Sequence, residues 1–509
     1  MMFHWKKAVV IATAAVLALA GCTPADSGPE GSSGGTLTLG LLLPASTFSA
    51  QGASWANESP YMQAVYDGLL RAEPDGTIVP HLATEWSYSD DLTVLDLTLR
   101  DDVTFSDGTP FNADAAAQNL IRFRDGTSPN ASFLVNLADA KAIDDTHLEL
   151  TLSSPDPALL TYLTQNAGLQ ESPEAFDNPD VETVPVGSGP YTLNVDETVV
   201  GNSYVFDKNP DYWKSEDQHY DKLVMNVYTD STSLLSAIQG GQVNVSTTSD
   251  NTTADQIEAA GYTLSPIENN WWGLIIGDRD GTLNPAIGDP RVRQAINYAF
   301  DRDAMLQAAA DGRGTVTQQV FPTSSPSFDS ALDDTYSYDA VKAKKLLAEA
   351  GYPDGFDLIM PSAAALGASN FTLIQQQLGD VGIRVTYEEV QVNDYINTIV
   401  TGKYAVTFMA LQLDPTDWQL SQFELDKTAT FNGFHNDDPT VQGHIATIQT
   451  GTAEEAEKAG KALNAYIVEQ GWFAPWFRPE LNTASDATTD VIVQVGNSYP
   501  YLWNIKPKA

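Results

Sequence analysis

A change of pattern near residue 272 constrains the fold most strongly. Before it, apolar residues alternate in short runs such as "VLDLTLR" and "HLELTL", which are typical of half-buried antiparallel strands. After it, helix and strand patterns take turns, as in "DPRVRQAINYAFDRDAML", "SYDAVKAKKLLAEAG", "IRVTYEEV" and "AVTFMALQL". This alternation predicts an α/β unit with a largely parallel sheet that follows a β-rich block.

Helix boundaries can be read from local signals. Asn112 and Asp289 stand where N-cap residues are preferred, and Pro290 occupies the first helical position after Asp289. Gly351 closes the helix in "SYDAVKAKKLLAEAG". The segment "TLTLGLLLP" near the start predicts a buried strand.

The chain has one cysteine, Cys22, so no internal disulfide can form. Lys6 and Lys7 precede an apolar run from Ala8 to Ala20, which is the layout of a secretory signal peptide and is too short to span a bilayer. The residues just before Cys22 resemble the bacterial lipobox, in which the cysteine is lipidated and becomes the first residue. We expect a signal peptide over 1–21 and a flexible linker, rich in Gly, Ser and Pro, over 22–35.

About 474 residues follow this linker, enough for two to four domains with large cores. Without Lys6 and Lys7 the chain carries 24 Lys and Arg against 67 Asp and Glu, a formal charge of about −43. Such acidity argues against nucleic-acid or anionic-lipid surfaces as partners. No second apolar segment approaches membrane-spanning length.

Motifs for catalysis are weak or missing. "GSSGG" at 31–35 fits G-x-S-x-G in letters only, because no buried strand precedes it and no helix follows. The sequence contains no P-loop, no dinucleotide fingerprint and no histidine pair at helical metal spacing, although His435 and His444 could converge in space. We therefore expect no enzyme activity, no cofactor and no metal.

Aromatic residues gather near the joins between segments, at Trp55, Trp271, Trp272, Trp418 and in "GWFAPWFRPE". Rigid aromatic side chains at domain edges suit a ligand cleft between domains, although each could equally be core.

Five ordered segments resemble one family. They are "VYDGLLRAEPDGTIVPHLATEWSYSDDLTVLDLTLRDDVTFSDGTPFNADA", "PVGSGPYTL", "FDKNPDYW", "DPRVRQAINYAFDRDAML" and "AKKLLAEAGYPDGF". The chain is similar to the extracellular solute-binding proteins of family 5, which serve ABC importers for peptides, opines and nickel. The resemblance implies a two-lobed periplasmic-binding-protein-like α/β fold (type II, class C) with an extra inserted subdomain.

The same resemblance implies how the chain divides. Lobe I would take 36–70, 187–270 and 479–509, with 71–186 inserted as a subdomain, and lobe II would take 271–478. The lobes would close over a ligand by hinge motion and then dock on membrane permease subunits. We expect a monomer, held by its lipid on the outer face of the cytoplasmic membrane.

Peptide-binding relatives meet the ligand's amine with an aspartate, and dipeptide binders meet its carboxylate with an arginine. The segment "LDPTDW" matches the aspartate-bearing loop, which leaves Asp414 and Asp417 as alternatives. Ala368 and Ser369 stand near the place of the arginine, for which Arg478 is a possible substitute. The expected ligand-binding residues are Trp55, Trp271, Trp272, Asp414, Asp417, Trp418, Trp476 and Arg478.

These observations favour a binding lipoprotein for a peptide or peptide-like amide that is cationic or neutral at one end and apolar or aromatic at the other. The alternatives are a non-peptide ligand such as an aromatic amide or hydrazide, an opine or a metal chelate. An exported hydrolase or a chaperone on the same scaffold is a further alternative of a different class.

Overall fold

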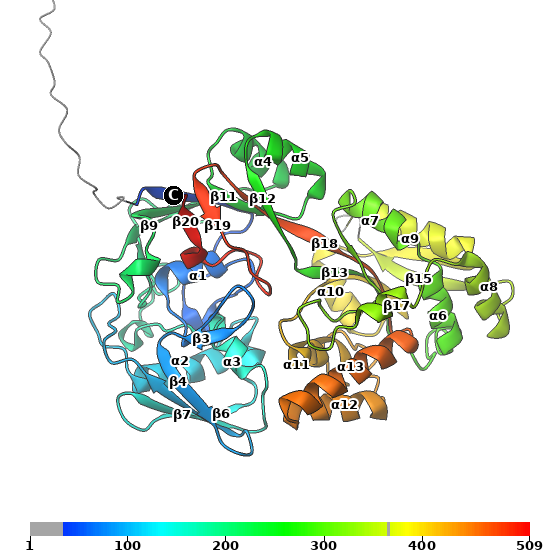
Figure 1. Ribbon diagram of the computed structural model, residues 1–509, viewed down its shortest axis with the longest axis horizontal. Helices are drawn as coiled ribbons and strands as arrows, with labels where there is room; N and C mark the ends of the chain where they lie inside the picture. The colour runs from blue at the N-terminus through cyan, green and yellow to red at the C-terminus, as the bar shows by residue number, and fades with distance from the viewer. Residues whose placement is uncertain (1–33, 364–366, 509) are drawn as a thin grey trace, which may run out of the picture. The chain divides into compact units, whose positions relative to one another are not determined.

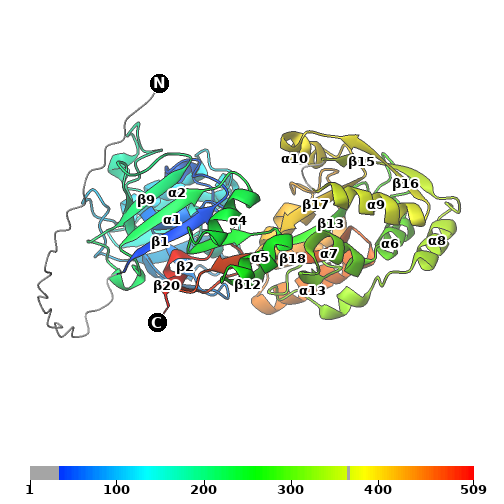
Figure 2. The same ribbon diagram turned by 90° about the horizontal axis from the view of Figure 1, so that it is seen from above.

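One long strand near the C-terminus, β18 (Phe473–Ser485), is shared by two groups of elements. Its first half pairs antiparallel with β13 (Asn270–Ile276) and β14 (Gly314–Val316). Its second half pairs antiparallel with β11 (Val245–Thr248) and β12 (Thr263–Glu268). Figures 1 and 2 show β18 leaving the side of β13 and reaching β11 and β12. We call the β11 side lobe I and the β13 side lobe II.

The computed structural model describes residues 34–363 and 367–508. The expected signal peptide 1–21, Cys22 and nearly all of the linker 22–35 lie outside the described residues. Over the two described ranges, no helix is both long enough and apolar enough to cross a membrane.

Lobe I is built on a mixed sheet. Strand β1 (Thr36–Leu41), the strand predicted in "TLTLGLLLP", pairs in parallel with β10 (Lys222–Val227) on one side and with β11 on the other. The sheet continues through β9 (Ser203–Lys208) to β8 (Tyr191–Leu193), both antiparallel. Its helices are α1 (Ser59–Val65), α4 (Ser231–Gln239) and α5 (Ala254–Ala259).

A separate four-stranded antiparallel sheet lies within the segment predicted to be an insertion. Its order is β4 (Ala83–Tyr88), β5 (Val94–Leu99), β7 (His147–Leu152) and β6 (Leu137–Ala142). Helices α2 (Ala113–Arg124) and α3 (Leu159–Tyr162) accompany it. The alternating leucines of β5 and β7 are buried, so the predicted half-buried antiparallel strands are confirmed.

The expected largely parallel sheet of lobe II is wrong. Strand β13 pairs antiparallel with β17 (Val406–Gln412) as well as with β18, and only β15 (Phe356–Ser362) and β16 (Ile383–Glu389) pair in parallel. Helix–strand alternation implies parallel neighbours only when successive strands pair with each other. Here the strand next to β13 comes from the far end of the chain.

The helices of lobe II follow the predicted order. The predicted N-caps are confirmed. Asp289 accepts a hydrogen bond from the Arg291 amide at the start of α6 (Pro290–Tyr298), and outside lobe II Asn112 accepts one from the Ala115 amide at the start of α2. Gly351 has φ +97° just after the helix that it closes. These helices are α6 (Pro290–Tyr298), α7 (Arg302–Ala310), α8 (Ala340–Glu349), α9 (Ala368–Asp380), α10 (Val392–Val400), α11 (Asp417–Leu420), α12 (Pro439–Thr450) and α13 (Ala453–Glu469).

Candidate functional site

A cavity of about 590 Å³ lies where the chain passes between the two lobes. It is lined by the ends of strands from both sides, by the middle of β18 and by a loop near the C-terminus. The lining residues are Leu42, Leu43, Ala56, Asn57, Thr247, Thr248, Ser249, Asn269, Asn270, Trp272, Ala410, Gln412, Pro479, Glu480, Leu481, Ser498 and Tyr499. We call it the junction cavity.

Strand parity decides which of the two neighbouring tryptophans reaches this cavity. In the antiparallel pair β13–β17, Trp272 lies opposite Ala410. Asn270, two residues before Trp272, lies opposite Gln412. Side chains two apart share a face of a strand, so these four residues form one wall of the cavity.

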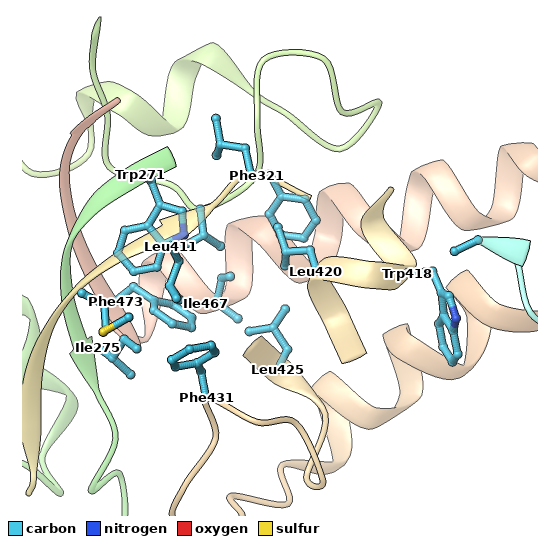
Figure 3. Close-up of a cluster of buried hydrophobic side chains, with 14 of the residues drawn as sticks. Trp271, Ile275, Phe321, Leu411, Trp418, Leu420, Leu425, Phe431, Ile467 and Phe473 are labelled. Carbon is cyan, nitrogen blue, oxygen red and sulfur yellow. The ribbon is translucent and has the colours of Figure 1, made fainter. Parts of the chain in front are cut away.

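Trp271 points to the opposite face of the same strand. It is fully buried and lies among Ile275, Leu411 and Phe473 in the core of lobe II (Figure 3). Its indole Nε1 donates to Glu424 Oε1 at 3.1 Å. Trp271 therefore supports the cavity wall from behind and does not line it.

Of the two candidate aspartates, Asp417 has both carboxylate oxygens occupied. Oδ1 accepts a hydrogen bond from Ser325 Oγ at 2.5 Å, and Oδ2 accepts one from Ser327 Oγ. Burial raises the pKa of Asp417, and the two hydroxyls partly offset that effect. Asp417 is buried at the start of α11, where these contacts hold the loop 325–327 against the helix.

Asp414 lacks such partners. Its Oδ2 is enclosed and has no hydrogen-bond partner among the described residues. Asp414 follows Gln412 of the cavity wall by two residues, although it does not itself line the junction cavity. Burial raises the pKa of Asp414 to about 7.

Glu424 is a second buried carboxyl close enough to Asp414 to influence its charge. Burial, and then the nearby Asp414, raise the pKa of Glu424 well above its usual value. Glu424 Oε2 also lacks a partner among the described residues. Two buried acids with unsatisfied oxygens form a place where a cation would be stabilised.

The remaining predicted site residues pack inside the protein. Trp418 lies in the core of Figure 3, and Trp476 is fully buried and stacks on Phe408 at 5.6 Å between ring centroids. Trp55 is buried in lobe I, next to Ala56 and Asn57 of the cavity. The structure thus brings Trp272 to the cavity and Asp414 near it, but not these three tryptophans.

Arg478 does not face the cavity either. Its side chain is fully buried, and Nη2 donates to the carbonyl oxygens of Phe321 at 3.0 Å and Gln319 at 3.3 Å. Burial lowers its pKa. No basic side chain is among the residues that line the junction cavity in the described part of the chain, and Glu480 is the charged residue there.

Sequence reasoning missed the polar lining. Asn57, Asn269, Ser498 and Tyr499 come from three loops that are far apart in sequence. None of them belongs to a recognisable motif, so only the assembled fold reveals them. Glu480 belongs to the segment "GWFAPWFRPE", in which the aromatic residues are the distinctive feature of the sequence.

Within residues 34–363 and 367–508 no group of three or more His, Cys, Asp or Glu side chains could hold a metal ion. His435 Nδ1 lies 3.1 Å from the Lys427 carbonyl oxygen, and neither His435 nor His444 lines the cavity.

The profile of "Bacterial extracellular solute-binding proteins, family 5 Middle" matches residues 77–430, well over half of the chain. The chain belongs to the bacterial extracellular solute-binding proteins of family 5. This family 5 protein is 31% identical over 310 residues to the "Nickel-binding periplasmic protein" of Escherichia coli (strain K12). The matched segment covers 58% of this chain and 57% of that relative, which is less than two thirds of the relative's length.

Two further likenesses place the family 5 protein among known sequences and folds. It is 30% identical over 385 residues to the "Glutathione-binding protein GsiB" of Escherichia coli (strain K12), covering 69% of this chain and 72% of that protein. It also resembles the solved structure of the ABC transporter-associated periplasmic binding protein DppA from Helicobacter pylori in complex with peptide STSA. The TM-score is 0.76 at 20% identity, over 94% of this chain and 98% of that one. The family 5 protein therefore has the two-lobed type II periplasmic-binding-protein fold.

Proposed function

We propose that this family 5 protein is the substrate-binding component of an ABC importer and that it captures a peptide or a peptide-like amide in the junction cavity. The cavity carries the proposal: both lobes line it, it offers backbone-like hydrogen-bonding partners such as Asn57, Asn269 and Gln412, and a bound ligand would link the lobes. The names of the relatives agree with small solutes of this kind, since one binds glutathione and one holds a peptide.

The proposed lobes keep the boundaries expected from the sequence, namely 36–70, 187–270 and 479–509 for lobe I, 71–186 for the insertion and 271–478 for lobe II. The chain passes between them at 268–270 and 479–480, where β12 leads into β13 and β18 changes partners. Few backbone angles need to change there for the lobes to close over a ligand.

Asp414 is the proposed partner of the ligand's amine. An ammonium would satisfy its enclosed oxygen and offset the charge that burial opposes. Asp417 is the weaker candidate because Ser325 and Ser327 already occupy it. Since the described lining of the cavity offers no cation for a carboxylate, an amide or a carboxylate that reaches solvent suits the other end better.

The test is a thermal-shift screen over peptides, small amides, sugars and metal ions. A ligand should raise the unfolding midpoint as its concentration increases. Trp272→Ala and Asp414→Ala should weaken binding at least tenfold without unfolding the protein, whereas Trp418→Phe should leave affinity unchanged. The proposal fails if no class of compound shifts the midpoint, and the site assignment fails if both alanine variants bind normally.

Nickel or a nickel chelate is a second candidate, favoured by the name of one relative. Titration of the purified protein with Ni²⁺, alone and with free histidine, decides between the two. Incubating any identified ligand with the protein and recovering it intact would support binding without turnover, and a chemically altered ligand would instead support the hydrolase alternative.

A further inference from the structure

A second cavity, of about 460 Å³, opens in lobe II beside the junction cavity. The two cavities share Trp272 and Ala410 in their linings. The second one continues to Phe408, Ile396 and Ala309. We call it the side chamber.

The side chamber continues the wall of the junction cavity. Along β17 the residues Gln412, Ala410 and Phe408 share one face of the strand, because side chains two apart point the same way. Gln412 lines the junction cavity, Ala410 lines both cavities, and Phe408 lines the side chamber. A ligand lying along this face would thus pass from polar to apolar surroundings.

Trp272 stands at the boundary between the two cavities. Its ring makes an edge contact with Phe408 at 6.1 Å and a tilted contact with Phe477 at 5.7 Å between centroids. These contacts hold the indole in place while the side chain stays only half-buried. A rigid, partly exposed aromatic face is well suited to stack on a flat ligand group.

The lining of the side chamber is mostly apolar. No Asp, Glu, Lys, Arg or His is among the described residues that line it, and its polar members are Ser369 and Asn370. Ile396 lines the chamber, and its apolar side chain is 44% exposed. A charged group entering the chamber would lose its hydration without gaining a partner.

We infer that the side chamber receives an uncharged aromatic or large aliphatic end of the ligand whose polar part lies in the junction cavity. This inference rests on the proposed function and adds the ligand's second recognition element. Ala368 and Ser369 begin helix α9, which borders the chamber. They stand near the place expected for the arginine with which dipeptide binders meet the ligand's carboxylate. Neither residue is charged, so this part of the described wall offers no partner for a carboxylate.

The experiment compares Ala-Ala-Trp amide with Ala-Ala-Ala amide by isothermal titration calorimetry. Burial of the indole should make the first bind roughly 30-fold more tightly, and Ala-Ala-Glu amide should bind no better than the alanine peptide. Ala309→Phe, which fills the chamber, should abolish the preference for Trp. Ala348→Phe is the matched control, because Ala348 is an exposed helical alanine outside both cavities.

A second arm does not need an amine. Crystals soaked in 4-bromobenzamide should show anomalous bromine density between Trp272 and Ile396, and density elsewhere would overturn the inference. Equal affinity for the Trp and Ala amides, or a preference that survives Ala309→Phe, would also overturn it while leaving the proposed function intact. If no peptide amide binds but bromine occupies the chamber, the chamber stands and the peptide class is wrong.

Discussion

At the scale of single residues, the proposed contact between Asp414 and the ligand's amine depends on the charge of the Asp414 carboxyl. Among the described residues, the titratable groups that interact electrostatically with Asp414 are Glu424 of lobe II and Tyr162 of the predicted insertion, and neither is basic. Only the ionised carboxylate attracts an ammonium. Because burial raises the pKa of Asp414 to about 7, affinity should increase with pH across this value.

We therefore expect the affinity for Ala-Ala-Trp amide to rise about 20-fold between pH 5.5 and 7.5, measured by calorimetry. Trp272→Ala should keep this dependence at lower overall affinity, since it leaves the carboxyl group in place. Asp414→Asn should flatten it. A wild-type affinity that is constant over this range would assign the amine to another group.

The same carboxyl affects stability with a defined sign. Its folded-state pKa is raised, so its contribution is fully present below about pH 4 and is lost as pH rises toward 7. Asp414→Asn avoids this loss. Relative to the wild type, the variant should gain about 2 kcal/mol in unfolding free energy between pH 5 and pH 8 in urea titrations, and a gain that does not change with pH would contradict the assignment.

The sequence points to residue types for a binding site but not to the directions in which their side chains lie. Trp271 and Trp272 are adjacent and identical, and which one faces the cavity depends on the register between β13 and β17. Asp414 and Asp417 are the same residue type, and the positions of Ser325 and Ser327, almost a hundred residues away, distinguish them. Contacts between distant segments carry this information.

At the scale of elements, the antiparallel pairing of β13 with β18 depends on Gly273. The register between the two strands shifts at Trp272 and Gly273, and a Cβ at 273 would lie 2.4 Å from the Ala474 carbonyl oxygen. Backbone cannot move aside as a side-chain tip can. Gly273→Ala should therefore cost about 2 kcal/mol or more of stability in urea denaturation.

The matched control is Gly379→Ala, because a Cβ at Gly379 in helix α9 has no neighbour within 4 Å. That substitution should be neutral or slightly stabilising, since alanine favours the helix. Equal losses of stability at both positions would show that β13 and β18 can move apart without cost.

Elements were predicted well wherever their signals are local. The caps at Asn112 and Asp289 bind the amides that such residues bind elsewhere, and the alternating leucines of β5 and β7 lie in an antiparallel sheet as expected. Strand pairing in lobe II was predicted wrongly because β18 is nearly 200 residues from β13. Periodicity describes a strand and says nothing of which strand lies beside it.

At the scale of the whole molecule, the proposed lipid anchor rests on Cys22 alone. Cys22→Ser should release the protein from the membrane fraction and abolish incorporation of radiolabelled palmitate, because the thioether cannot form without the thiol. Ligand affinity should not change, since Cys22 is not among the residues that line the junction cavity. A membrane-bound serine variant would mean that something other than a lipid on Cys22 retains the protein.

The position of β18 near the end of the chain also affects when each lobe can fold during synthesis. It comprises Phe473–Ser485 of 509 residues, and until it has been synthesised both β11 and β13 have an open edge. The main sheets of both lobes therefore cannot be completed before β18 is made, whereas the separate sheet β4-β5-β7-β6 does not depend on it. If the protein is exported, as the sequence predicts, such a delay would keep the chain able to pass unfolded through a translocation channel until almost all of it has been made.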